Sequence, residues 1–87
     1  MKYIINKINY DKKYDVLNVA FFDTSNSYGD EDVDNIVWLK DIDSDKVTGI
    51  TIINFIHMVM KNDYKIQELT KCLDVSKLIE YTKTIRD

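Results

Sequence analysis

The chain has few of the residues that cross-link or interrupt a small fold: one cysteine, no proline and two glycines among 87 residues. A single cysteine excludes the internal disulfide framework on which many small secreted domains depend. Gly29 and Gly49 are isolated, which excludes a glycine-rich loop that cradles a phosphate. No signal-peptide pattern opens the sequence and no linker divides it. We therefore expect one cytoplasmic domain over 1–87, with a sheet in 1–54 and a helical tail in 55–87.

Long apolar runs and excess positive charge are also missing. The longest apolar run, residues 50–56, is interrupted by Thr51 and Asn54 and is far shorter than the roughly 20 residues of a membrane-spanning helix. The net charge of −3 and the pI near 5.0 argue against non-specific binding to nucleic acid. We expect no direct nucleic-acid partner and no membrane partner. A hydrophobic content of 45% is typical of a globular domain.

The first half of the chain has the residue pattern of β-strands. Residues 2–10 and 15–22 are rich in isoleucine, valine, tyrosine and phenylalanine, which predicts a hairpin. In the second of these strands Leu17, Val19 and Phe21 share the face that we expect to enter the core. Residues 23–34 are polar and acidic and are interpreted as a long loop. Residues 36–42 and 47–53 predict a second hairpin, so that the sheet is an antiparallel meander of about four strands.

After Asn54 the apolar period changes from two towards 3.6, which predicts helices. Asn54 is the expected N-cap of the first helix, and Asn62 with Asp63 should end it and begin the next. A second cap is expected at Asp74 or Ser76, where the chain either starts a new helix or bends one. Short helices are marginal alone in water, so their apolar faces must dock on the sheet. The expected fold is α+β, with two or three short C-terminal helices packed on one face.

One spacing of aromatic, acidic and aliphatic residues stands out in the first half: Tyr10, Asp11, Asp15, Leu17, Val19 and Phe21. It fits the pattern Y-D-x-x-x-D-x-L-x-[IV]-x-F and resembles the opening motif of a widespread prokaryotic and phage family of short proteins of unknown function. The resemblance covers residues 2 to about 54. It implies a small antiparallel sheet with a helical end and brings no assigned chemistry. The chain departs from the family pattern at Thr51, where a glutamate is usual.

The motif residues also have a physical interpretation of their own. Asp11 falls in a turn, where a short carboxylate can accept hydrogen bonds from nearby backbone N–H groups, and Asp15 lies where the hairpin resumes. Tyr10 and the aliphatic positions have the residue types of packing positions. We therefore predict a structural role for this motif.

Two spacings that suggest catalysis or metal binding fail on inspection. Asp41-x-Asp43-x-Asp45 resembles the start of a calcium loop, but Lys46 stands where glycine is needed and Ile52 where a bidentate glutamate is needed. The single cysteine and single histidine lie in apolar segments, where packing is the ordinary role of both. We predict no catalytic residues, no metal site and no cofactor, and hence no enzyme.

The charge distribution gives the best candidate for a binding surface. Between residues 23 and 45 there are eight acidic residues and one basic residue, a local net charge of −7. The lone tryptophan lies in a strand whose two faces are both apolar, so one face needs a cover: the helical tail, a second copy or a partner. The predicted partner-binding residues are Asp30, Glu31, Asp32, Asp34, Asp41, Asp43, Asp45 and Trp38.

These features predict a small non-enzymatic regulator or inhibitor that binds another protein with a basic surface, because complementary charge speeds encounter and selects partners. Twelve isoleucines and eleven lysines beside one alanine indicate an A/T-rich coding sequence and a bacterial or phage origin. One concrete version is a phage-type inhibitor of a host defence nuclease. The alternatives are an antitoxin-like module that neutralises a toxin through its helical tail and a self-associating ligand-binding domain. A homodimer is one assembly compatible with the sequence, which does not define the oligomeric state.

Overall fold

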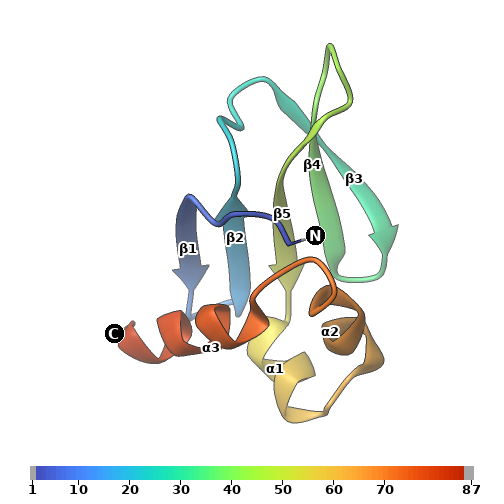
Figure 1. Cartoon of the computed structure of the whole chain (residues 1–87). Helices are drawn as coiled ribbons and strands as arrows, with labels where there is room; N and C mark the ends of the chain where they lie inside the picture. Colours follow the sequence, from blue (N-terminus) through green and yellow to red (C-terminus); the bar gives the residue numbers. More distant parts are fainter. Residues whose placement is uncertain (1, 86–87) are drawn as a thin grey trace.

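The computed structural model describes residues 2–85 and contains one antiparallel sheet with the strand order β1-β2-β5-β4-β3 (Figure 1). The strands are β1 (Lys7–Asp11), β2 (Val16–Ala20), β3 (Ser27–Val33), β4 (Ile36–Asp41) and β5 (Val47–Ile53). Three helices follow: α1 (Phe55–Met60), α2 (Tyr64–Leu69) and α3 (Val75–Thr84). The fold is therefore α+β, with the helices after the sheet, as the sequence predicts.

The strand order corrects the predicted meander. The hairpins β1–β2 and β4–β5 are present, but β5 lies between β2 and β4, at the centre of the sheet. β5 has more buried residues than any other strand, as expected for a strand with a neighbour on each side. Its close packing explains Gly49, because a Cβ there would lie 2.5 Å from the backbone oxygen of Val19.

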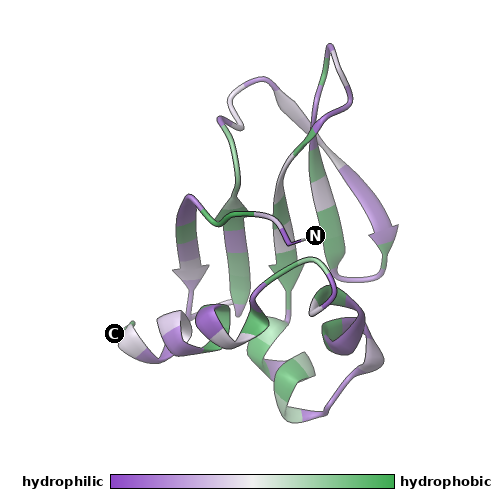
Figure 2. Cartoon of the chain, in the orientation of Figure 1, coloured by the Kyte–Doolittle hydropathy of each residue, from purple (hydrophilic) through white to green (hydrophobic). Residues whose placement is uncertain are grey.

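The largest error of the sequence interpretation is at β3, because residues 23–34 were expected to form a loop. Residues 27–33 instead form a fifth strand that pairs with β4 and lies at the edge of the sheet. Most of its side chains are exposed on both faces, so the strand lacks the alternation of apolar and polar residues that identifies a half-buried strand. Figure 2 shows it as a hydrophilic strand beside the apolar β4.

The first residues of the chain also differ from the prediction, since the strand begins at Lys7 and not at residue 2. The preceding segment crosses the face of the sheet (Figure 1). The Tyr3 N–H donates to the Cys72 carbonyl at 2.8 Å, and the Tyr3 ring stacks on Phe21 with 4.4 Å between centroids. This segment therefore ties the tail to the sheet and covers part of the core.

The helix boundaries agree with the sequence prediction except at the first cap. Asp63 accepts from Lys65 N at 2.9 Å and Asp74 accepts from Lys77 N at 3.2 Å, so residues 74–76 separate two helices. Asn54, the predicted first cap, has a left-handed backbone and makes no capping hydrogen bond. Asp15, in the turn just before β2, caps α1 in its place. None of the helices within residues 2–85 is long and apolar enough to cross a membrane.

The core lies on one face of the sheet, where the helices and the N-terminal segment cover it. Leu17 on β2, Ile52 on β5 and Ile36 on β4 stand side by side in the register and are buried. This confirms the predicted inward face of β2. Over the described residues, no side chain of the opposite face belongs to the core cluster, and Val37 and Leu39 of β4 stay half-exposed there. One face of the sheet is thus left uncovered.

Candidate functional site

The residues of the family-like motif form a structural junction between the first hairpin and α1. The Tyr10 hydroxyl donates to Asp15 Oδ1 at 2.7 Å, and the same carboxylate accepts from the backbone N–H groups of Ile56 at 2.9 Å and His57 at 3.0 Å. Asp11 accepts from Tyr14 N at 3.2 Å within the turn, as predicted. The motif therefore joins the first hairpin to α1, and both of its carboxylates accept hydrogen bonds within the fold.

Tyr10 should make the stability of the protein sensitive to high pH. Desolvation and the hydrogen bond to Asp15 raise the pKa of Tyr10 from 10.0 to about 12. The folded state holds the proton more tightly, so this contribution is complete below pH 10 and is lost as the pH rises through about 12. Urea unfolding from pH 9 to pH 12 should show a steeper loss of stability in the wild type than in Tyr10→Phe. Parallel curves for the two proteins would contradict this assignment.

The predicted acidic surface divides into two parts, and the first part is engaged in its own turn. Asp41 accepts from the backbone N–H groups of Asp43 and Ser44, which lowers the pKa of its carboxyl group. Asp43 accepts from the Asn26 amide at 3.0 Å, and Asp45 accepts from the Tyr28 hydroxyl at 2.9 Å, which raises the pKa of that hydroxyl. Asp41, Asp43 and Asp45 together are the acidic turn, and their hydrogen bonds shape the β4–β5 connection.

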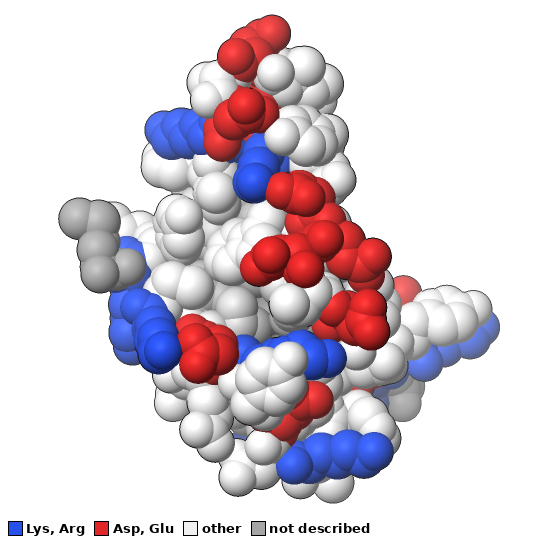
Figure 3. Space-filling model, turned by 90° about the vertical axis from the view of Figure 1, so that its right-hand side faces the viewer, with Lys and Arg blue, Asp and Glu red and all other residues white. Residues whose placement is uncertain are grey.

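The second part follows the edge strand and is mostly free. Asp30, Glu31, Asp32 and Asp34, which we call the β3 ridge, lie on β3 and its turn. Asp30 accepts from Lys40 Nζ at 2.6 Å, which raises the pKa of Lys40. Within residues 2–85 no hydrogen bond or ion pair engages the carboxylates of the other three. Figure 3 shows a band of acidic side chains on this side of the molecule.

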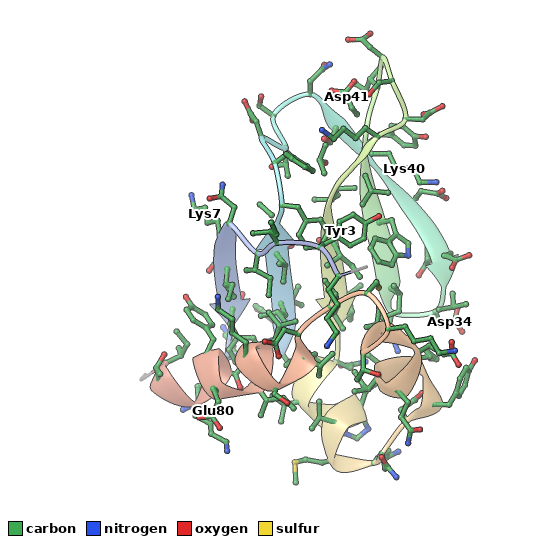
Figure 4. All side chains as sticks on the ribbon, in the orientation of Figure 1. Tyr3, Lys7, Asp34, Lys40, Asp41 and Glu80 are labelled. Carbon is green, nitrogen blue, oxygen red and sulfur yellow. The ribbon has the colours of Figure 1, made fainter. Side chains whose placement is uncertain are left out.

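Trp38 lies in a groove beside this ridge. Two hollows of about 240 and 310 Å³ share Trp38 and Asp32 as lining residues, so we treat them as one Trp38 groove. The N-terminal segment and α2 supply the opposite side, with Tyr3, Tyr64 and Glu68. The Tyr3 ring lies 6.1 Å from Trp38 between centroids. Figure 4 shows Tyr3 over the sheet, and Lys40 and Asp34 towards opposite ends of the β3–β4 hairpin.

The groove combines an aromatic floor with an excess of carboxylates. Three carboxylates and two ammonium groups line it, a net charge of −1: Asp30, Asp32, Glu68, Lys40 and Lys65. Lys40 is paired with Asp30, and Lys65 Nζ donates to the Asp34 carbonyl at 3.2 Å. A lysine or arginine side chain of a partner could therefore contact the Trp38 ring and a free carboxylate together, a favourable cation–π arrangement.

The sequence interpretation identified half of this groove. Composition and charge indicate Trp38 and the acidic residues of β3, and of these the structure brings Asp30 and Asp32 into the groove with Trp38. The sequence does not indicate Tyr3, Tyr64 or Glu68, because they come from the N-terminal segment and from α2, and no local pattern shows that these segments meet β3 and β4. The acidic turn was grouped with β3 because a sequence gives charge density but not hydrogen-bond partners.

Among residues 2–85, Cys72 and the other hollows offer no clear reactive or ligand-binding group. Cys72 lines the groove, but burial raises the pKa of its thiol, which keeps it protonated and unreactive. Another hollow, of about 540 Å³, lies away from the groove and is mainly apolar, lined by Val59, Met60 and Ile79 among others. In the described part of the chain, no three His, Cys, Asp or Glu side chains are grouped so that they could hold a metal ion.

Comparison of the chain with family models, with curated proteins and with solved structures finds no match. The resemblance of residues 2 to about 54 to a family of unknown function stays a prediction, and the function is argued from the groove alone.

Proposed function

We propose that the protein is a small non-enzymatic regulator or inhibitor that binds a basic surface of another protein through the β3 ridge and the Trp38 groove. The observation that carries the proposal is the position of Asp32, whose carboxylate has no partner among residues 2–85, beside the half-buried Trp38 in one groove. Glu31 and Asp34 add two more such carboxylates to the same edge of the sheet. Unpaired surface carboxylates give electrostatic steering and selectivity, and a tryptophan in a groove is the residue type that most often anchors an interface.

The specific form that we favour is an inhibitor of a host defence nuclease, which occupies the basic channel where the nuclease holds nucleic acid. An acidic ridge on an edge strand can reach into such a channel, and its charge matches the surface it would cover. The antitoxin-like alternative assigns partner binding to Leu69, Leu73, Leu78 and Ile79. The first three are buried in the protein's own core, so the folded chain presents little apolar surface there to a toxin.

The test uses a ridge variant and a matched turn variant with equal charge change. The ridge variant is Glu31→Gln, Asp32→Asn and Asp34→Asn. The turn variant is Asp43→Asn and Asp45→Asn together with Glu80→Gln, an exposed residue of α3 that makes the number of removed charges equal. A partner captured from bacterial lysate by the wild-type chain is purified and titrated with each protein at low salt. We expect the ridge variant to bind at least tenfold more weakly, about 1.4 kcal/mol, and the turn variant to bind within twofold of wild type.

Salt and fluorescence complete the test. Raising the ionic strength should weaken binding by the wild type more than binding by the ridge variant, because screening acts on the charges that the variant lacks. Trp38, the only tryptophan, should change its emission when the partner binds. Equal affinity of all three proteins, or capture of no partner, would contradict the proposal. A captured toxin whose binding ignores both the ridge and salt would favour the antitoxin-like alternative.

A further inference from the structure

The outer edge of β3 has backbone groups without partners. The Ile42 N–H donates to the Asn26 carbonyl at 2.9 Å, which identifies this pair as hydrogen-bonded across the β3–β4 ladder. Opposite pairs in an antiparallel ladder alternate between bonded and non-bonded. Asp30 therefore directs its backbone groups towards β4, whereas Gly29 and Glu31 direct theirs away. Among residues 2–85 no strand pairs with that side of β3.

The edge is open to an incoming strand. Gly29 has no side chain, and a Cβ at this position would lie 2.9 Å from Val37 Cγ1, so the glycine allows close pairing with β4. Two N–H and two C=O groups, from Gly29 and Glu31, lie in line along the exposed strand. The irregular register between Glu31 and Val33 marks where this regular stretch ends. Such an edge is a template for strand addition by another chain.

The charge of the edge selects the occupant. A second copy that paired through its own β3 would place carboxylates of the ridge opposite one another, and like charges in cross-strand positions are destabilising. Acidic side chains on an edge strand thereby protect it from self-association. A basic segment that pairs with β3 is instead attracted to it. Asp32 lies on the groove side of the strand and Glu31 on the opposite face, and neither carboxylate has a partner among residues 2–85.

We propose that the partner binds by adding an extended segment with alternating basic residues to β3, as a sixth strand of the sheet. The segment pairs its backbone with Gly29 and Glu31 and places lysine or arginine side chains beside Asp32 and the Trp38 groove. This inference rests on the proposed function and specifies the conformation of the partner. Backbone pairing provides affinity in this mode of recognition, and side-chain charge provides selectivity.

A pair of synthetic peptides tests the backbone contribution separately from charge. The probe is a nine-residue peptide of alternating lysine and valine with blocked ends, and its twin is methylated on every backbone nitrogen. Both carry the same charge and the same side chains, but only the probe has N–H donors. We expect the probe to bind at least tenfold more tightly than the twin. Amide hydrogen exchange at Gly29 and Glu31 should be fast in the free protein and slow in the complex.

Each alternative outcome has a distinct meaning. If the probe and its twin bind equally, and the ridge variant weakens both, strand addition is wrong while the proposed function stands. If the ridge variant binds the probe as the wild type does, or the probe does not bind, both proposals fail. If the amides of Gly29 and Glu31 are already protected in the free protein, and protection increases with protein concentration, a second copy occupies the edge and the proposal is overturned.

Discussion

Replacing Phe55 by alanine should lower the free energy of unfolding by about 3 to 5 kcal/mol, the largest loss we expect from a single side chain. Phe55 is the first residue of α1, is separated by one residue from the end of the central strand β5, and is fully buried. The substitution removes a ring from the point where the sheet and the helical layer meet. Domains of this size are marginally stable, so the variant should be largely unfolded at physiological temperature.

Urea denaturation followed by Trp38 fluorescence and by circular dichroism measures this loss. Met60→Ala is the matched control, because Met60 lies in the same helix with 82% of its surface exposed and should change the stability by less than about 0.5 kcal/mol. A cost below 1 kcal/mol for Phe55→Ala would show that this residue is not central to the core.

Replacing Asp15 by alanine should cost about 2 to 3 kcal/mol, because one side chain serves three functions. Its carboxylate caps two N–H groups of α1 across 41 positions of sequence and accepts from Tyr10. Loss of a helix cap typically costs about 1 kcal/mol. Asp15 also has a positive φ of 55°, where alanine is disfavoured by about 1 to 2 kcal/mol.

Two further variants separate these contributions. Asp15→Asn keeps an acceptor oxygen and tolerates the left-handed backbone, so it should cost only about 1 kcal/mol. Asp63→Ala removes a local cap of α2, where one N–H group is accepted, and should cost a similar amount. Equal stabilities of Asp15→Ala and Asp63→Ala in urea titrations would contradict the long-range role of Asp15.

These two predictions bear on the proposed binding site. Asp15 and Phe55 hold α1 to the sheet. The next helix along the chain, α2, lines the groove. A variant that loosens this attachment should also disturb the groove side formed by Tyr64 and Glu68. For this reason the ridge variant changes only exposed side chains of β3 and its turn, where substitutions leave the core intact.

The elements with a strong apolar signal could be predicted from the amino-acid sequence. The hairpins β1–β2 and β4–β5, the inward face of β2 and the helical tail follow from periodicity, turn residues and caps. The sequence leaves open whether residues 74–76 bend one helix or separate two, and the structure shows two helices there. The α+β class follows from their order along the chain. Local signals suffice here because each of these elements buries one face, and burial imposes a period that can be counted in the sequence.

How the elements pack and pair with one another became visible only in the three-dimensional fold. Residues 27–33 form a strand because they hydrogen-bond to the edge of β4, although they lack the alternating pattern of a half-buried strand. The cap of α1 comes from Asp15, far away in sequence, because the chain folds back on itself. The division of the acidic residues into a bonded turn and a free ridge depends on hydrogen-bond partners from other segments. Long-range pairing of this kind leaves no periodic trace in the sequence, and it is what forms the Trp38 groove.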